Sequence, residues 1–140
     1  MMSNKQITMK RLQKEEISLD KDPIPGVFVK RESFLNFHFC IYGLDEPYKG
    51  GYYYGLLQLH ENYPFAAPKL FFYTRSGRFE TDLSICTSFT HYHQESWTSA
   101  WNVRSLIIAT ISFMTSEEPS YGCRNDPASM RKKYAENSLK

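Results

Sequence analysis

Residues 36–60, NFHFCIYGLDEPYKGGYYYGLLQLH, decide the fold of this 140-residue chain. From Asn36 to Tyr42 every second residue is large and apolar, and Tyr52 to His60 has the same period of two. That period is typical of a strand with one buried face. Pro47 and the Gly50-Gly51 pair mark a turn between the two runs. The segment therefore predicts two neighbouring antiparallel strands.

Two shorter runs extend this sheet. Val27 to Lys30 is rich in β-branched residues, and Lys69 to Tyr73 follows a turn marked by Pro64 and Pro68. Short turns can join consecutive strands only when neighbouring strands run antiparallel, as they do in a meander. We therefore expect a four-stranded meander sheet.

Helical periodicity flanks these strands. Residues 4–19 have a thin apolar stripe and predict an amphipathic surface helix. Residues 102–114 have a broad stripe, with Asn102 placed as the cap, and predict a largely buried central helix. A C-terminal helix is expected from Asp126-Pro127 toward Ser138, with Asp126 as its cap. A helix, four strands, a long loop and two further helices predict the α+β class.

The composition is that of one folded globular domain, expected to cover residues 1–140. Hydrophobic residues make up 41% and charged residues 23%, and the net charge is +2. Such near-neutrality argues against nucleic acid as a partner. No apolar run approaches the roughly 18 residues of a membrane span. Three widely spaced cysteines indicate a reducing compartment rather than a disulfide framework.

The aperiodic segment 74–100 is the candidate functional region, because long irregular loops in compact domains usually carry function. Cys86 lies inside it among Ser and Thr residues, and His91 and His93 follow. A polar or electropositive setting would favour the thiolate, the nucleophilic form of cysteine. Cys86 is therefore a candidate nucleophile, with a structural cysteine as the alternative. Cys40 falls in a strand pattern and is interpreted as a buried hydrophobe.

Several alternatives stay open from the residues alone. A Cys/His metal site would use Cys86, His91, His93 and His60. Its spacing matches no standard zinc pattern. Trp97 and Trp101 are expected to roof the core, and Trp101 is also a candidate partner contact. The basic residues of the first helix form either a solvated face or a docking surface; they are Lys5, Lys10, Arg11 and Lys14.

The segment from Tyr63 to Trp101 resembles the ubiquitin-conjugating enzymes, the carriers between ubiquitin-activating enzyme and ubiquitin ligases. The matching pieces are YPFAAP at residues 63–68, the strand KLFFYT after it, SIC ending at Cys86, and Trp97 with the apolar helix that follows. With the first helix and the meander, the resemblance covers about residues 5–125 and implies the ubiquitin-conjugating fold.

Three further motifs are similar to one divergent branch of this family: GRFETDLSIC at residues 77–86, YHQESW at residues 92–97 and SFMTSEE at residues 112–118. Members of that branch are anchored by a C-terminal tail in the endoplasmic reticulum membrane and serve the degradation of faulty proteins there. We expect no membrane contact by residues 1–140 themselves. The expected location is cytoplasmic, or the cytosolic face of the endoplasmic reticulum if an anchor follows.

The resemblance implies that Cys86 accepts ubiquitin as a thioester and passes it to protein substrates with a RING-type ubiquitin ligase. No cofactor is expected, because ATP is used by the upstream activating enzyme. The basic residues of the first helix would meet that activating enzyme. The ligase contact would be formed by Phe65, Ser99, Ala100 and Trp101.

The chain departs from the pattern of its relatives at several positions. The active-site Asn of the family is missing from the aligned residues 74–76, and Ser76 is the candidate replacement as an oxyanion donor. His91 stands where the branch usually has Asp, and Gln94 where it usually has Pro. Ser99 replaces the Pro of the Ser-Pro-Ala segment that contacts ligases.

The second transfer must deprotonate the attacking amine or hydroxyl. His91 or His93 is the candidate base, since imidazole titrates near neutral pH. The missing Asn leaves open a catalytically silent family member that acts as a binding scaffold. A thiol hydrolase with a Cys/His pair is a third interpretation.

Overall fold

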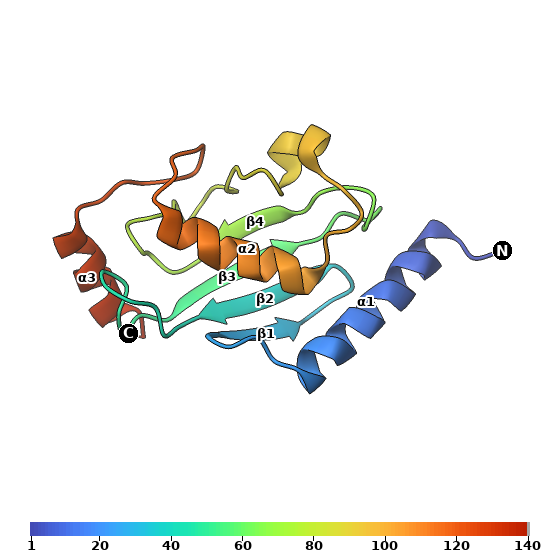
Figure 1. Cartoon of the computed structure of the whole chain (residues 1–140), viewed down its shortest axis with the longest axis horizontal. Coiled ribbons are helices and arrows are strands. Elements are labelled where there is room, and N and C mark those ends of the chain that lie inside the picture. The colour runs from blue at the N-terminus through green and yellow to red at the C-terminus, as the bar shows by residue number, and fades with distance from the viewer. Residues whose placement is uncertain (140) are drawn as a thin grey trace.

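The computed structural model describes residues 1–139 and confirms the α+β class. The elements in chain order are α1 (Asn4–Lys21), β1 (Val27–Arg31), β2 (Asn36–Ile41), β3 (Tyr53–Gln58), β4 (Lys69–Phe72), the 3-10 helix η1 (His91–Ser96), α2 (Val103–Ser116) and α3 (Ala128–Asn137). The strands form one antiparallel sheet in the order β1-β2-β3-β4, as Figure 1 shows. The predicted meander is therefore confirmed.

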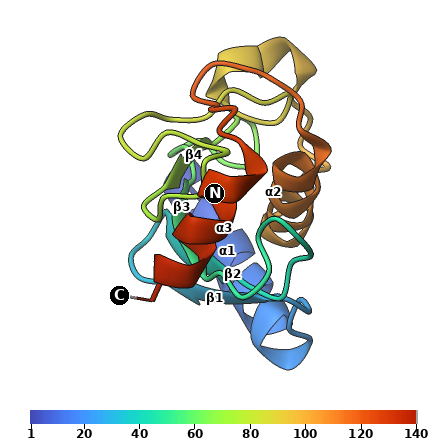
Figure 2. The same cartoon turned by 90° about the vertical axis from the view of Figure 1, so that its left-hand side faces the viewer.

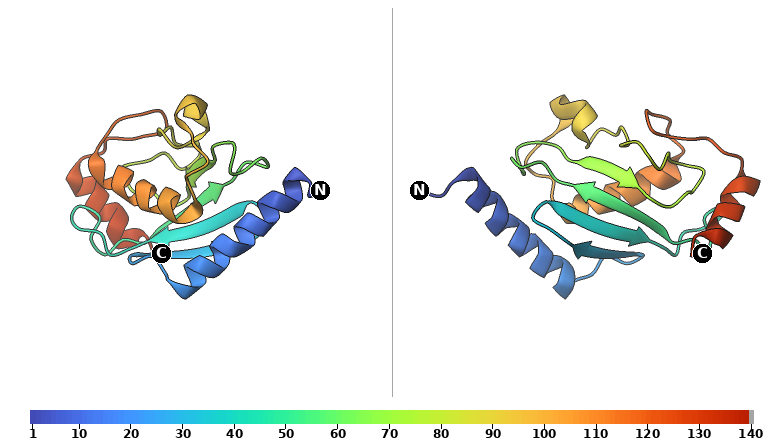
Figure 3. Two further views of the ribbon diagram at one scale, coloured as in Figure 1. Left: turned by 45° about the vertical axis from the view of Figure 1, so that its right-hand side comes forward. Right: turned by 180° about the vertical axis from the view of Figure 1, so that it is seen from behind.

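The core lies between α2 and one face of the sheet. Figure 2 shows α2 beside the sheet as a second layer. The view from behind in Figure 3 shows that, within residues 1–139, no helix crosses the opposite face. The pairing of Phe39 with Gly55 explains why a glycine stands in β3, because a Cβ there would overlap the Phe39 ring. The core residues supplied by α2 are Val103, Leu106, Ile107, Thr110 and Met114.

The first and central helices begin as the sequence predicts. Asn102 caps α2, and its side chain accepts a hydrogen bond from the Ser105 backbone N–H at 2.8 Å. Helix α1 starts after a Ser3 cap and ends at Lys21, two residues beyond the expected end. It lies along one end of the molecule beside the sheet and the start of α2 (Figures 1 and 3).

The expected cap of the C-terminal helix is wrong. Helix α3 starts at Ala128, Pro127 occupies the N-cap position, and no side chain caps the helix. The Asp126 carboxylate instead pairs with Arg124 at 3.1 Å. Proline fits just before a helix because it has no N–H to leave unpaired.

Within the aperiodic segment 74–100, threonine hydroxyl groups order residues 87–90. The Thr87 backbone N–H donates to Thr90 Oγ1 at 2.9 Å, and the Phe89 N–H donates to Thr87 Oγ1 at 3.1 Å. The short helix η1 follows directly and was not expected from the sequence. Local side-chain bonds of this kind leave no periodic trace in a sequence.

Candidate functional site

The backbone of Cys86 is fixed between two neighbouring segments. The preceding Ile85 is fully buried, and its N–H donates to the Leu70 carbonyl of β4 at 2.8 Å. On the other side, the Cys86 N–H donates to the Tyr121 carbonyl at 2.9 Å. The Ser120 hydroxyl donates to the Cys86 carbonyl. These contacts occupy the backbone of Cys86 and leave its side chain free.

The Cys86 side chain opens into a groove of about 450 Å³, here called the Cys86 groove. The groove is lined by residues 86–89, His93, Ser96, Phe113 and residues 118–120. Cys86 is a free thiol of intermediate exposure. A free thiol in an open groove can be reached by the end of another chain.

The surroundings of Cys86 do not favour its thiolate. Burial raises the pKa of the Cys86 thiol, and the neighbouring acidic groups of Cys123 and Glu95 raise this pKa further. Only a backbone hydrogen bond at Tyr121 opposes the rise. The electropositive setting that would favour the thiolate is therefore not found among the described residues around Cys86, because the sequence neighbours of Cys86 are not the groups that face it in space.

His93 is the histidine that lines the Cys86 groove. Its Nδ1 lies 2.9 Å from Glu95 Oε1, and hydrogen bonding to His93 lowers the pKa of Glu95. A carboxylate only accepts hydrogen bonds, so Nδ1 carries the proton and the Nε2 of a neutral His93 has a free lone pair. This arrangement leaves Nε2 able to accept a proton.

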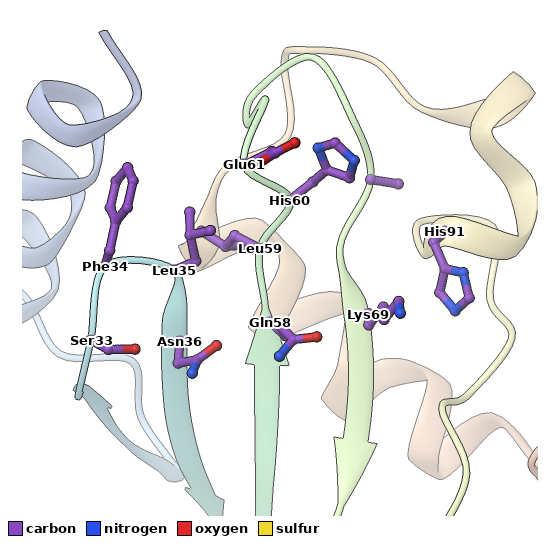
Figure 4. Close-up of a pocket in the computed structure, with 11 residues that line it drawn as sticks. Ser33, Phe34, Leu35, Asn36, Gln58, Leu59, His60, Glu61, Lys69 and His91 are labelled. Atoms are coloured by element: carbon purple, nitrogen blue, oxygen red, sulfur yellow. The ribbon is translucent and has the colours of Figure 1, made fainter. Parts of the chain in front are cut away.

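His91 lies in a different hollow, on the sheet side of η1. Figure 4 shows it beside Lys69, in a pocket of about 560 Å³ that His60 also lines. His91 Nε2 is 3.2 Å from Ser84 Oγ. Burial lowers the pKa of His91, and the Lys69 ammonium lowers it further. The structure thus places His91 away from the Cys86 groove.

The proposed metal ligands are divided between these two hollows. Cys86 and His93 line one, whereas His60 and His91 line the other. Among residues 1–139, no three His, Cys, Asp or Glu side chains come together in a group that could hold a metal ion. The geometry does not support the Cys/His metal alternative.

Ser76 lies outside the Cys86 groove. The residue is fully buried, and its Oγ accepts hydrogen bonds from the backbone N–H groups of Arg78 at 3.1 Å and Phe79 at 3.3 Å. These contacts make Ser76 part of a buried turn. A side chain without solvent access cannot reach an oxyanion in the groove, so the placement argues against the expected donor role.

Two exposed loops lie side by side at one end of the molecule. The Phe65 loop (residues 62–67) presents Phe65 with 72% of its surface exposed. The Ser99 turn (residues 98–101) presents Ser99 and Ala100 to solvent. Trp97, the residue directly before the turn, donates from Nε1 to the Pro64 carbonyl at 2.8 Å and so holds the turn beside the Phe65 loop. The structure therefore brings together the residues expected to form one contact surface.

The two tryptophans pack beneath this surface. Their rings stack with centroids 6.2 Å apart, and the Trp101 ring also packs on Phe89 at 5.5 Å. Both are partly buried against the core. Their expected place above the core is confirmed, and Trp101 offers only part of its surface to a partner.

The four basic residues of α1 do not share one environment. Lys5, Lys10 and Lys14 are exposed. Arg11 is half-buried, with its guanidinium 3.0 Å from Glu15 Oε2 and 2.7 Å from the Trp101 carbonyl. Arg11 therefore joins α1 to the Ser99 turn, and the expectation that it faces a partner with the three lysines is not supported.

The sequence pattern did not indicate that residues 119–123 belong to the site. They carry no periodicity, yet Ser120 contacts both Cys86 and Cys123, whose Sγ is 3.3 Å from Ser120 Oγ. Gly122 marks the close approach, because its φ is +89° and a Cβ would lie 2.8 Å from the Ser84 carbonyl oxygen. A glycine in an irregular segment was the one available sign of this packing.

The fold defines the class of protein. The structure matches human ubiquitin-conjugating enzyme E2 G1 with a TM-score of 0.70 at 21% identity, over 83% of this chain and 99% of the other. At this identity the match establishes the ubiquitin-conjugating fold.

Sequence comparisons establish the family. A family model described as "Ubiquitin-conjugating enzyme" matches residues 11–139. The chain is 39% identical over 132 residues to ubiquitin-conjugating enzyme E2 6 of Schizosaccharomyces pombe, over 92% of this chain. It is 38% identical over 115 residues, 80% of this chain, to an E2 J2-like enzyme of Dictyostelium discoideum. It is 31% identical over 132 residues, again 92% of this chain, to E2 J2 of Mus musculus. The chain belongs to the ubiquitin-conjugating enzyme family.

These relatives are longer than the chain. It spans 58% of the S. pombe relative, 68% of the D. discoideum relative and 51% of the mouse relative. Within residues 1–139, every helix is too short or too polar to cross a bilayer.

Proposed function

We propose that Cys86 accepts the C-terminal carboxyl of ubiquitin as a thioester and passes it to a substrate amine or hydroxyl. The observation that carries the proposal is a free, partly exposed Cys86 with a fixed backbone in the lining of an open groove, in a chain of this family. A thiol in this position meets the geometric need of a covalent acyl carrier.

The first step exchanges one thioester for another. The Cys86 sulfur attacks the carbonyl carbon of ubiquitin held on the cysteine of the activating enzyme. A new C–S bond forms, the old one breaks, the Cys86 proton is lost and the activating-enzyme cysteine leaves as a thiolate. Donor and product are both thioesters, so the step requires a thiolate and positioning more than driving force.

The second step transfers the acyl group from sulfur to nitrogen or oxygen. The acceptor attacks the thioester carbonyl, Cys86 leaves as a thiolate, and the acceptor proton must go to a base. We assign this base to His93, whose Nδ1 is hydrogen-bonded to Glu95 and whose Nε2 is free to accept a proton. His91 is not assigned a role, because it lines the other hollow.

Partners are assigned by surface. The exposed Lys5, Lys10 and Lys14 would meet an acidic face of the activating enzyme. Phe65, Ser99 and Ala100, with the exposed part of Trp101, would contact a RING-type ligase. The similarity of residues 77–86, 92–97 and 112–118 to the tail-anchored branch of the family supports work at the cytosolic face of the endoplasmic reticulum in the degradation of faulty proteins.

The test is incubation with activating enzyme, ATP and ubiquitin, followed by a non-reducing gel. The proposal predicts an adduct that disappears with added thiol and is absent from Cys86→Ala. Cys123→Ala is the matched control and should form the adduct, because Cys123 is not among the residues that line the groove. No adduct with the wild-type chain would contradict the proposal.

A silent scaffold is the second candidate. It is favoured by the buried Ser76, which leaves the missing Asn without a replacement, and by the raised pKa of Cys86. Discharge of a preformed thioester onto free lysine separates the two functions. The carrier loses its ubiquitin to lysine, whereas a scaffold shows no discharge beyond slow hydrolysis.

A further inference from the structure

Glu15 of α1 receives hydrogen bonds from three separate parts of the chain. Its Oε1 accepts from the Tyr63 hydroxyl at 2.9 Å and from the Val103 backbone N–H at 2.6 Å. Its Oε2 accepts from the Tyr63 hydroxyl at 2.7 Å and from Arg11 Nε at 3.0 Å. The side chain is only 14% exposed. One carboxylate therefore joins α1, the Phe65 loop and the start of α2.

The chemistry of these contacts is specific for a carboxylate. Val103 is the first residue of α2, whose first N–H groups have no partner within the helix, and a negative charge there also interacts favourably with the helix dipole. Burial raises the pKa of Tyr63, and the neighbouring Glu15 raises it further, so Tyr63 remains a neutral hydroxyl donor. Every group that meets Glu15 is a donor, and only an acceptor with two oxygens satisfies them all.

Arg11 extends the same network to the second loop. Its Nη2 donates to the Trp101 carbonyl at 2.7 Å, and its guanidinium lies 5.2 Å from the centre of the Tyr63 ring. Thr8, another α1 residue, donates from its buried Oγ1 to the Tyr63 carbonyl at 2.7 Å. The Phe65 loop and the Ser99 turn are thus both attached to α1 from beneath, while Phe65, Ser99 and Ala100 remain exposed above.

We propose that Glu15 is a positioning residue that sets the spacing between the Phe65 loop and the Ser99 turn, and so determines how strongly a ligase stimulates transfer from Cys86. This inference rests on the proposed function. Neither Glu15 nor any of its partners lines the Cys86 groove. Disturbing Glu15 should therefore weaken stimulation by a ligase and leave unassisted chemistry at Cys86 in place.

Glu15→Gln is the direct test, because it keeps the shape of the side chain and replaces one acceptor oxygen by an NH₂ donor. That donor would face the donors of Arg11 or Tyr63. The matched control is Glu16→Gln on the same helix, whose carboxylate instead pairs with Arg31 of β1 at 3.6 Å. Both variants remove one negative charge from α1, and only the first touches the loops.

The measurement is single-turnover discharge of the ubiquitin thioester onto free lysine, with and without a RING domain. A panel of isolated RING domains from endoplasmic-reticulum ligases is first screened with the wild-type chain. The RING domain that stimulates discharge most is then used for all variants. For Glu15→Gln we expect stimulation to fall about tenfold, the change that about 1.4 kcal/mol in a barrier produces, and unassisted discharge to stay within about twofold. Glu16→Gln should match the wild type in both assays.

A second variant guards against a general loss of structure. Tyr63→Phe removes one hydroxyl donor and keeps the ring on which Arg11 lies. It should lower stimulation by less than Glu15→Gln, and the double variant should be no worse than Glu15→Gln alone, because the two residues act through one contact. Hydrogen exchange should rise at residues 63–67 and 98–103 in Glu15→Gln and remain unchanged in Glu16→Gln.

Four results would overturn the inference. Unchanged stimulation of Glu15→Gln contradicts it, and so does an equal loss of assisted and unassisted discharge. Absence of stimulation of the wild-type chain by every RING domain defeats the ligase part of the proposed function and this inference with it. Absence of any thioester on the wild-type chain defeats the proposed function itself, so the failures are distinguishable.

Discussion

Irregular chain segments are held in place in two different ways in this molecule. One set of contacts surrounds Cys86, and the other, here called the Glu15 network, consists of Glu15, Arg11, Tyr63 and Val103. Around Cys86 the contacts are backbone N–H groups, carbonyls and the Ser120 hydroxyl. Around Glu15 they are a carboxylate, a guanidinium and a phenol, all half-buried or deeper. The first set fixes the backbone of Cys86 without a charged group, and the second attaches two loops to α1 through charged and phenolic side chains.

For the proposed transfer of ubiquitin, the difference indicates which contacts would set the rate. The neighbours of Cys86 raise its pKa rather than lower it, so the groove does not hold a permanently activated thiolate. Positioning of the incoming thioester and of the acceptor must then contribute more than activation of sulfur. The loops held by Glu15 provide a means for a partner to supply that positioning.

The largest effect is expected at Arg78, where charge is used for stability beside the groove. Arg78 is 1% exposed and donates to the carbonyls of Phe113 at 2.8 Å, Met114 at 3.0 Å and Glu118 at 2.8 Å, at the end of α2. Arg78→Met leaves these carbonyls without a donor and should lower the free energy of unfolding by about 3 kcal/mol. Urea unfolding measures the loss. The exposed Arg75→Met is the control and should stay within about 0.5 kcal/mol of the wild type.

The next effect separates the two histidines. His93→Gln should slow unassisted discharge onto free lysine about 100-fold, within the usual contribution of a general base. His91→Gln should change it less than about twofold, because His91 lies in the other hollow. Single-turnover discharge at pH 7.5 measures both, and equal losses in the two variants would contradict the assignment of the base.

The pH dependence of Cys86 tests the neutral character of the groove. Only the thiolate reacts, so below the thiol pKa the rate of alkylation should rise about tenfold per pH unit. Since the pKa of Cys86 is raised, this rising limb of the pH–rate profile should lie at higher pH than for an ordinary cysteine, whose pKa is near 8.5. Cys123→Ala removes an acidic neighbour and should shift the limb to lower pH. Iodoacetamide labelling read at the Cys86 peptide measures it, and a limb below the ordinary range would contradict the described surroundings.

The smallest effect is expected on the exposed face of α1. Lys10→Glu should slow loading by the activating enzyme about threefold to tenfold at low salt, and the difference should shrink as salt rises. Lys133→Glu on α3 makes the same charge change far along the chain and should load normally. Initial rates of loading at two salt concentrations measure the effect. Equal slowing by both variants would contradict the proposal that α1 is the docking surface for the activating enzyme.

The elements of the fold were predictable because they depend on periodicity. The period of two in β2 and β3 and the broad apolar stripe of α2 placed these elements within a few residues of their bounds. The cap at Asn102 was also predictable, since capping is local. Asp126 was misassigned because its partner Arg124 lies before the helix rather than in it.

The candidate site was predictable only where one residue type carries the chemistry. Cys86 stood out by its thiol and its irregular surroundings. The roles of His91 and His93 could not be separated, since the kink inside η1 at His93 directs neighbouring histidines into different hollows. Arg11 was misplaced because its partner Trp101 lies 90 residues away and is brought to it by tertiary packing. Ser76 was misplaced because its hydroxyl accepts from the backbone N–H groups of Arg78 and Phe79, a local turn contact that the alignment with the family Asn did not indicate.

Transfer of ubiquitin to Cys86 is measured most directly by the intact mass of the chain after incubation with activating enzyme, ATP and ubiquitin. We expect the mass to increase by one ubiquitin less one water, and the added ubiquitin to map to Cys86 and to be removed by hydroxylamine. Addition at Cys40, Cys123 or a lysine, or an unchanged mass, would contradict it.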